Sequence, residues 1–336
     1  MMEAFPFSAI VGQHEMKRCL ILTAVDPTIG GVLVLGDRGT GKSTIVRSLA
    51  SLLPKIRAVE NCPYNCSRKN DACEYCKNEE TNSTVNKVAP VIDLPLGSTE
   101  DRVVGSLDIE VALKRGEKNF EPGLLARANR GFLYIDEINL LEDHIVDLLL
   151  DVAASGENLV EREGLSIRHQ SKFVLIGSGN PEEGELRPQL LDRFGLSLEV
   201  KSPTDIDQRI EVVKRRDLYE QNPRKYIKKW HSEEVKLRKK IQHAKKLIKT
   251  IPSSHSTVKK CASICLELGT DGLRGELTLL RSARANAAFK GKVKVDDNDI
   301  REVCIPALRH RLRRNPLDEA GSDVRIARVI DNILNT

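Results

Sequence analysis

A glycine-rich segment near the start of the chain constrains the fold more than any other part of the sequence. Residues 36–43 read Gly-Asp-Arg-Gly-Thr-Gly-Lys-Ser and fit the pattern G-x-x-x-x-G-K-[ST]. The apolar run 31–35 before it predicts a buried strand, and residues 44–53 after it have the apolar spacing of a helix. A strand, a glycine-rich turn and a helix in this order are typical of an α/β fold with a parallel sheet.

The residue types in this segment point to a nucleoside triphosphate bound with Mg²⁺. Glycines let the backbone bend closely around a polyphosphate, and the start of the next helix offers peptide N–H groups to the same anion. Lys42 supplies a cation to the β- and γ-phosphates, and the hydroxyl of Ser43 ligates Mg²⁺. The predicted ATP-binding residues are Gly36, Asp37, Arg38, Gly39, Thr40, Gly41, Lys42, Ser43 and Thr44.

An acidic pair follows another apolar run. Residues 132–135 are Phe-Leu-Tyr-Ile, and Asp136 and Glu137 come directly after them. A buried strand that ends in two acids places carboxylates at the edge of the sheet where open α/β folds bind ligands. We predict that Asp136 holds Mg²⁺ through water and that Glu137 polarises the attacking water.

Three further polar residues are predicted to assist catalysis. Asn180 follows the apolar run 172–177 and is suited to orienting water and sensing the γ-phosphate, although Asn-Pro is also a common turn. Arg193 lies beside Asp192, so it is either part of a local ion pair or an arginine finger for a neighbouring subunit. Arg274 lies near a predicted helix start, from which it could reach back to the nucleotide.

The sequence pattern predicts two domains. Residues 1–203 are predicted to form an α/β ATPase domain with a central parallel sheet, and residues 204–336 a helical domain. In the first domain we expect strands at 31–35, 89–94, 131–135 and 172–177, a helix at 144–154, and a β-hairpin at 156–169 that turns at Gly164. In the second we expect helices at 205–219, 233–250, 257–268, 275–288 and 296–312. The basic stretch 224–249 carries an apolar stripe, which indicates a buried helix face below a solvated basic face; a docking surface for an acidic partner is the alternative.

Charge and hydropathy narrow the functional class. Basic residues exceed acidic ones by 53 − 48 = 5, and 13 residues are aromatic, so neither argues for binding to nucleic acid. The longest apolar runs fall well short of the roughly 18 residues that span a bilayer, and the N-terminus has no signal-peptide pattern. We therefore expect a cytoplasmic protein with no membrane span, whose cysteines stay reduced.

Four of the eight cysteines lie close together in the sequence. They follow the pattern Cys62-x₃-Cys66-x₆-Cys73-x₂-Cys76 within a polar stretch. Four thiolates suit a tetrahedral Zn²⁺ or, less readily, an iron–sulfur cluster. Redox-active dithiols and incidental free thiols are the alternatives. Cys19, Cys261, Cys265 and Cys304 lie in helical patterns and are expected to be small buried hydrophobic residues.

Taken together, these motifs resemble those of the AAA+ ATPases and, more narrowly, those of the I subunits of the magnesium chelatase family. The similarity spans nearly the whole chain. It is carried by residues 7–13, 36–43, 93–105, 120–131, 139–147, 179–195, 272–285 and 311–322. The cysteine cluster departs from the pattern of plant and cyanobacterial members.

The resemblance implies a hexameric ring that binds Mg-ATP at subunit interfaces. Lys42 and Ser43 would be the Walker A pair, Asp136 and Glu137 the Walker B pair and Asn180 sensor 1. Arg193 would be an arginine finger acting in trans, and Arg274 sensor 2. Residues 93–105 and 156–169 would be the helix-2 and hairpin insertions, both facing partners in this family.

The resemblance also implies a function and partners. The ring would work with a D subunit and a large porphyrin-binding H subunit, and ATP hydrolysis would drive insertion of Mg²⁺ into protoporphyrin IX on the H subunit. Such a complex is a ligase that forms nitrogen–metal bonds, in the cytoplasm or, in a photosynthetic eukaryote, in the plastid stroma. The alternatives are a cobalt chelatase motor for cobalamin synthesis, a DNA-remodelling AAA+ ATPase and a non-enzymatic scaffold.

Overall fold

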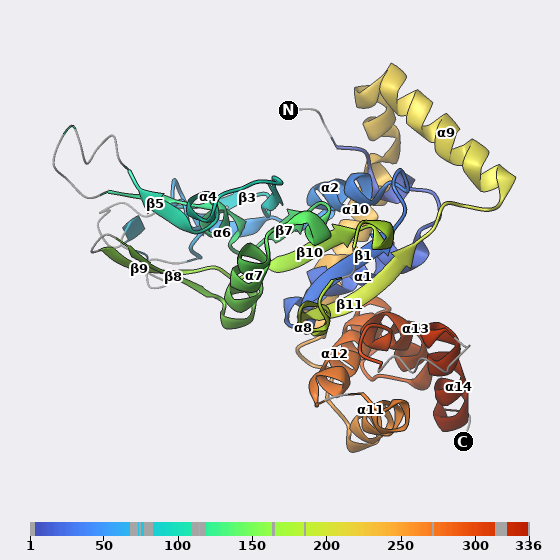
Figure 1. Cartoon of the computed structure of the whole chain (residues 1–336). Helices are drawn as coiled ribbons and strands as arrows, with labels where there is room; N and C mark the ends of the chain where they lie inside the picture. Colours follow the sequence, from blue (N-terminus) through green and yellow to red (C-terminus); the bar gives the residue numbers. More distant parts are fainter. Residues whose placement is uncertain are drawn as a thin grey trace. The chain divides into compact units, whose positions relative to one another are not determined.

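A computed structural model describes residues 4–67, 73, 75–76, 83–108, 114, 119–162, 165–184, 186–270, 272–312 and 321–334 (Figure 1). The chain divides into two compact units. The first consists of residues 1–52 and 179–336, and the second of residues 53–178. The predicted boundary near Pro203 remains a prediction, because the first unit holds residues on both sides of it.

The central sheet has five strands in the order β11–β1–β10–β7–β4. These strands are β1 (Gly31–Gly36), β4 (Val91–Leu94), β7 (Phe132–Ile135), β10 (Val174–Gly179) and β11 (Phe194–Val200). In the first unit β1 pairs with β11 in parallel, and in the second β7 pairs in parallel with β4 and β10. Every residue of β7 and β10 is buried, as expected for a parallel sheet covered on both faces. The predicted α/β class is therefore confirmed.

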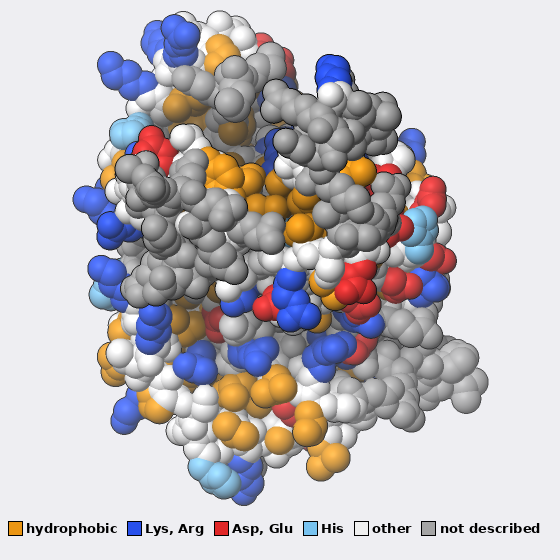
Figure 2. Space-filling view, turned by 90° about the vertical axis from the view of Figure 1, so that its left-hand side faces the viewer, with side chains coloured by type: hydrophobic (Ala, Val, Ile, Leu, Met, Phe, Trp, Pro, Cys, Tyr) orange, Lys and Arg blue, Asp and Glu red, His pale blue; other side chains and the backbone are white. Residues whose placement is uncertain are grey.

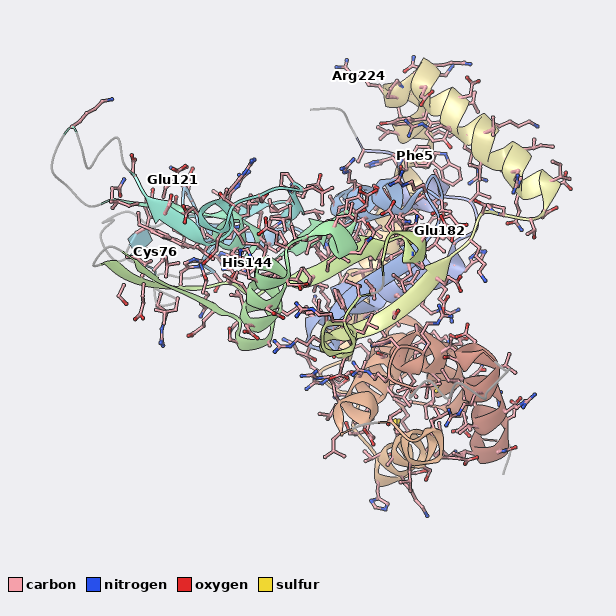
Figure 3. The ribbon with its side chains drawn as sticks, in the orientation of Figure 1. Phe5, Cys76, Glu121, His144, Glu182 and Arg224 are labelled. Atoms are coloured by element: carbon pink, nitrogen blue, oxygen red, sulfur yellow. The ribbon has the colours of Figure 1, made fainter. Side chains whose placement is uncertain are left out.

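The first unit surrounds its two strands with helices. Its elements before the second unit are η1 (Phe7–Ala9), α1 (His14–Val25), η2 (Pro27–Ile29), β1 and α2 (Lys42–Leu52). After it come η4 (Pro181–Glu183), α8 (Pro188–Arg193), β11, α9 (Ile206–Gln221), α10 (Pro223–Leu247), α11 (His255–Leu268), α12 (Arg274–Phe289), α13 (Asp297–Leu308) and α14 (Ser322–Leu334). Phe5 joins the chain's start to this helical part, with its ring centroid 5.2 Å from that of Tyr219 and 5.6 Å from that of Tyr226 (Figure 3).

Helix α10 starts ten residues earlier than the helix predicted at 233–250. The side chain of Asn222 accepts a hydrogen bond from the backbone N–H of Lys225 at 3.0 Å, and Pro223 occupies the first turn. Asparagine at the cap and proline at the first helical position are strong start signals, which the prediction from apolar spacing alone missed. The apolar stripe itself is buried, with Ile241 and Ala244 fully enclosed.

The second unit adds small antiparallel sheets to its part of the central sheet. Its elements are β2 (Ile56–Val59), β3 (Thr84–Lys87), β4, α4 (Glu100–Val104), β5 (Gly105–Leu107), β6 (Phe120–Pro122), α6 (Leu124–Ala128), β7, η3 (Ile138–Leu140), α7 (Asp143–Ser155), β8 (Glu157–Arg162), β9 (Leu165–Gln170) and β10. An antiparallel pair, β8 with β9, lies where the hairpin is predicted (Figure 1). The expected turn residue, Gly164, lies outside the described residues. Residues 93–105 cover the end of β4, all of α4 and the start of β5.

None of the helices in the described part of the chain is both long and apolar enough to cross a bilayer.

Candidate functional site

The predicted phosphate loop connects β1 to α2 in the first unit. Its lysine is the first residue of α2, and its ammonium group donates hydrogen bonds to the carbonyl oxygens of Gly36 and, at 3.0 Å, of Asp37. The hydroxyl of Thr40 donates to the same carbonyl of Asp37 at 2.9 Å. Ser43 and Thr44 lie in the first turn of α2, where peptide N–H groups have no partner within the helix. The loop therefore folds around its own lysine at a helix N-terminus, which is the arrangement that favours a bound polyphosphate.

The glycines of the loop serve two different purposes. A Cβ at Gly36 would lie 2.1 Å from the carbonyl oxygen of Val200, so this glycine allows β1 to pack closely against β11. Gly39 and Gly41 have φ angles of +77° and +83°, and a Cβ on either would meet no atom within 4 Å. These two glycines are needed for their backbone conformation, and the space beside them is open to a ligand.

The turn after β10 meets the loop through an ion pair within the first unit. Asn180 is buried, and its side-chain oxygen accepts a hydrogen bond from the backbone N–H of Glu182 at 3.2 Å (Glu182 is labelled in Figure 3). The carboxylate of Glu183 pairs with the guanidinium of Arg38. This ion pair therefore joins the segment of Arg38 to the segment of Asn180, two residues predicted from the sequence. No sequence pattern indicated a role for Glu183.

Two arginines from the helical part of the first unit share one carboxylate on α8. Arg274 donates to Asp192 Oδ2 at 2.5 Å, and Arg311 pairs with the other oxygen of Asp192. The side chain of Arg311 is only 2% exposed, and it also donates to the carbonyl of Phe194 at 2.7 Å. Arg193, the residue after this carboxylate, is exposed. Asp192 is therefore the partner of Arg274 and Arg311, and Arg193 lies on the surface of the unit.

His310 makes the first unit sensitive to acid. Its Nε2–H donates to the carbonyl of Phe194 at 3.0 Å, and burial beside Arg311 lowers its pKa to about 3. Below about pH 6.5 the unfolded chain binds a proton that the folded chain does not, so stability falls as the pH falls. We expect this residue to lower the free energy of unfolding by about 1 kcal/mol between pH 6.5 and pH 5.5, with the full slope of about 1.4 kcal/mol per pH unit reached only further below pH 6.5.

Urea unfolding of the wild type and of His310→Gln at pH 7.5, 6.5 and 5.5 measures this loss. Glutamine keeps a donor for Phe194 and does not titrate. The wild type should lose more unfolding free energy than the variant between pH 6.5 and 5.5, and equal losses would contradict the assignment.

The acidic pair lies in the second unit, directly after β7. The carboxylate of Asp136 accepts hydrogen bonds on Oδ1 from the hydroxyls of Tyr134, at 2.8 Å, and Ser178, at 2.6 Å. The Ser178 oxygen in turn accepts from the backbone N–H of Glu137 at 3.3 Å. Two hydroxyls from neighbouring strands therefore orient Asp136 and fix the peptide that follows it.

Glu137 has a backbone conformation that is uncommon for its residue type. Its φ angle is +55°, in the left-handed region that residues other than glycine rarely occupy. Its carbonyl accepts from Leu140 N–H at 2.9 Å, and its own N–H donates to Ser178, so the turn is held from both sides. Such outliers cluster at functional sites, which supports the role predicted for Glu137.

Sequence reasoning missed Tyr134 and Ser178. Both lie in fully buried strands, where a polar hydroxyl needs a partner. Tyr134 stands two residues before Asp136, and its hydroxyl reaches the carboxylate that follows β7. A tyrosine two residues before the first acid was the sequence signal that could have predicted this support for Asp136.

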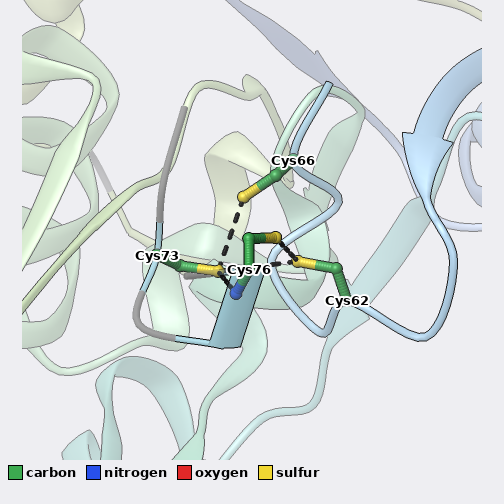
Figure 4. Close-up of side chains that lie close together, drawn as sticks. All are labelled: Cys62, Cys66, Cys73 and Cys76. Carbon is green, nitrogen blue, oxygen red and sulfur yellow. Dashed lines mark hydrogen bonds between the residues drawn. The ribbon is translucent and has the colours of Figure 1, made fainter. Parts of the chain in front are cut away.

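The four neighbouring cysteines converge in the second unit. The Sγ atoms of Cys62, Cys66, Cys73 and Cys76 all lie within 4.8 Å of one another, and all four residues are buried (Figure 4). Hydrogen bonds from the thiols of Cys66 and Cys73 lower the pKa of Cys62. The other cysteines differ: Cys19, Cys261, Cys265 and Cys304 are buried in helices and, within the described residues, do not form a group of metal-binding spacing, and burial raises the pKa of Cys261 to about 12. The four clustered cysteines are therefore a candidate metal centre. The four helical cysteines are buried, as expected for small hydrophobic residues.

Comparison with protein families gives two matches. Residues 6–189 match the family described as magnesium chelatase, subunit ChlI. Residues 258–330 match the AAA lid domain, which covers part of α11, all of α12 and α13, and part of α14.

Individual relatives align over almost the entire chain. The magnesium-chelatase 38 kDa subunit of Cereibacter sphaeroides is 62% identical over 99% of this chain and all of its own length. The magnesium-chelatase subunit ChlI of Euglena gracilis is 50% identical over 98% of this chain and 97% of its own.

Two solved structures resemble the fold. A chain in a model of the complex between subunits BchI and BchD of magnesium chelatase, based on cryo-EM, is 56% identical, with a TM-score of 0.56 and coverage of 98% of this chain and 99% of that one. A putative ATPase from Cytophaga hutchinsonii has a TM-score of 0.64 at 18% identity, covers 96% of this chain and 91% of its own, and supports the fold alone. With a family match over more than half its length and relatives aligned from end to end, the chain belongs to the ChlI family of magnesium chelatase subunits, which are built on the AAA ATPase fold.

Proposed function

We propose that this chain is the ATP-hydrolysing motor subunit of a magnesium chelatase. With a D subunit and a large H subunit, it drives insertion of Mg²⁺ into protoporphyrin IX for chlorophyll or bacteriochlorophyll synthesis. The observation that carries the proposal is the end-to-end 62% identity to a magnesium-chelatase 38 kDa subunit. The phosphate loop and the oriented acidic pair support it independently.

In the proposed reaction, the residues of each unit have separate tasks. The open backbone of Gly39 and Gly41 and the start of α2 would receive the phosphates, and Lys42 would turn from its loop carbonyls to the β- and γ-phosphates. Ser43 and Asp136 would hold the Mg²⁺ of Mg-ATP. Tyr134 and Ser178 keep the Asp136 carboxylate oriented for that task. Glu137 would take up the proton of the attacking water, which Asn180 would help to position.

The exposed Arg193 suits action on a neighbouring subunit. A guanidinium that stabilises charge on the γ-phosphate of another protomer has to lie on the surface of its own. The proposed assembly is a hexameric ring with ATP at its interfaces, in which Arg193 acts in trans and Arg274 acts as sensor 2. The contact of Arg274 with Asp192, the residue before Arg193, is consistent with these two roles.

A motor is needed because the chelation is physically difficult. Mg²⁺ gives up its water reluctantly, and a stiff macrocycle has to deform to accept it. A ring that changes shape during ATP turnover can deliver work to the H subunit, where we place the chelation itself. The expected location is the cytoplasm, or the plastid stroma in a photosynthetic eukaryote.

A cobalt chelatase motor is the alternative within the wider family. A DNA-remodelling ATPase has less support, because the Lys and Arg side chains of the face in Figure 2 are interspersed with acidic, apolar and neutral ones.

Reconstitution tests the proposal. The full chain is combined with a magnesium chelatase D subunit and H subunit, with protoporphyrin IX, Mg²⁺ and ATP, and Mg-protoporphyrin is measured by fluorescence. We expect insertion that depends on ATP and on this chain. Parallel reactions contain a cobalt chelatase large subunit with its own tetrapyrrole and Co²⁺. Insertion only in the cobalt reactions would overturn the magnesium assignment.

A further inference from the structure

The distances among the four clustered thiols match one tetrahedral metal ion. A Zn–S bond of about 2.3 Å in a tetrahedral site places sulfurs about 3.8 Å apart. The Sγ atoms of Cys62 and Cys73 are 3.7 Å apart, those of Cys66 and Cys73 3.7 Å, and those of Cys76 and Cys62 3.5 Å (Figure 4). The four sulfurs thus already stand near the corners of such a site.

The same distances argue against the other occupants. A disulfide needs sulfurs about 2.05 Å apart, well below the observed separations. An iron–sulfur cluster puts several iron and sulfide atoms between its cysteines, so its thiolates stand farther apart than around one ion. The backbone N–H of Cys76 donates to Cys73 Sγ at 3.4 Å, a type of bond that supports a metal-bound thiolate.

One half of the cluster is firmly attached to the rest of the second unit. The backbone N–H of Val59 donates to the carbonyl of Cys66 at 2.8 Å. Asn65, whose φ angle is +52°, donates through Nδ2 to the carbonyl of Arg127 at 3.1 Å, and Asn129 donates to the carbonyl of Tyr64 at 2.6 Å. Cys62 and Cys66 are therefore docked at the end of α6, and a metal would join Cys73 and Cys76 to this docked half.

A chain of contacts leads from the docked half to the predicted insertions. The ring of Tyr64 lies 4.7 Å from the imidazole of His169 on β9. Asn158 on β8 donates to His169 Nε2 at 3.0 Å and to the carbonyl of Val104, at the end of α4, at 3.0 Å. The Nδ1–H of His169 donates to the carbonyl of Gln170 at 3.1 Å, which leaves Nε2 as the acceptor of the neutral ring, and burial lowers the pKa of this histidine. Tyr64, which lies between Cys62 and Cys66 in the sequence and packs with the cysteines, thus connects the cluster to the open end of the β8–β9 hairpin.

We propose that Cys62, Cys66, Cys73 and Cys76 bind one Zn²⁺ that braces the base of the β8–β9 hairpin. The site is structural and shares no residue with the predicted nucleotide site. It is closed, since four thiolates fill a tetrahedral coordination sphere and leave no position for a substrate.

Metal analysis of the full chain, purified without chelator and then equilibrated with Zn²⁺ and desalted, tests the ligand set. We expect about one zinc per chain in the wild type and in the control Cys304→Ser, whose cysteine is buried in α13. Cys73→Ser should lose most of the zinc. Replacement by Co²⁺ should give the visible bands of a tetrahedral thiolate site in the wild type, which keeps the test informative if Cys73→Ser folds poorly.

Two results would overturn the zinc site. One is a chain with no bound metal whose four thiols react with a thiol reagent in the native state. The other is iron accompanied by inorganic sulfide.

Hydrogen exchange tests whether zinc stabilises the β8–β9 hairpin, independently of activity. Removing zinc with a chelator should speed exchange in residues 157–162 and 165–170 by about tenfold or more, with little change in α11 and α12 of the first unit. Nucleotide binding by the phosphate loop should persist, so failure of the zinc site and failure of the motor assignment are distinguishable. Unchanged hairpin exchange in a zinc-depleted chain would refute the bracing role.

Discussion

Lys42→Ala is expected to weaken ATP binding at least about 100-fold, which corresponds to about 2.7 kcal/mol, and to abolish turnover. The lysine is the cation of the phosphate loop, and its contacts with Gly36 and Asp37 show that it reaches over the loop. Charge-assisted hydrogen bonds to phosphate are among the strongest that a protein makes, and alanine replaces none of them.

Calorimetry with a slowly hydrolysed ATP analogue, together with a phosphate-release assay, measures both losses. The matched control is Lys55→Ala, which removes an exposed lysine three residues after α2 and should leave both values unchanged. Normal binding by Lys42→Ala would contradict the assignment of the loop.

Glu137→Gln is expected to bind ATP almost normally but to hydrolyse it about 10²–10⁴-fold more slowly. Glutamine keeps the size and the backbone of this position, including its donor to Ser178, but it cannot take a proton from water. The change therefore separates binding from chemistry.

The control for Glu137→Gln is Glu142→Gln, at an exposed acid just before α7 whose side chain makes no capping hydrogen bond. Nucleotide affinity and single-turnover hydrolysis are measured for both variants. If Glu137→Gln turned over ATP at the wild-type rate, the proton acceptor would have to be another group.

The sequence predicts four of the five strands of the central sheet because they are continuous apolar runs, but it did not predict β11, whose sequence includes Gly195, Ser197 and Glu199. Residues 31–35 and 131–135 had the pattern of buried parallel strands, and both are strands. Helix α10 was predicted too short, because apolar spacing marks the buried face but not the capped start at Asn222. Helix α14 was not predicted at all, because it begins beyond the last apolar pattern that was interpreted.

The candidate site was predictable only where its chemistry is local in sequence. The phosphate loop and the acidic pair are short motifs, so residue order alone reveals them. The contact of Arg274 with Asp192 joins residues 82 positions apart, and the support of Asp136 by Ser178 joins residues 42 apart. Neither has a periodic pattern, so only the folded chain shows them. The cysteine spacing predicted a cluster, and the structure adds the convergence of four sulfurs.

The carboxylate of Asp192 links α8 to two later parts of the helical region of the first unit. It is bound by Arg274 of α12 and by Arg311 in the turn after α13, and the next residue along the chain is Arg193, which we propose acts on a neighbouring protomer. If α12 or the turn after α13 shifts during ATP turnover, these contacts would transmit the shift to the end of α8. Under the proposed function, the position of the Arg193 guanidinium would then depend on the nucleotide bound to its own subunit.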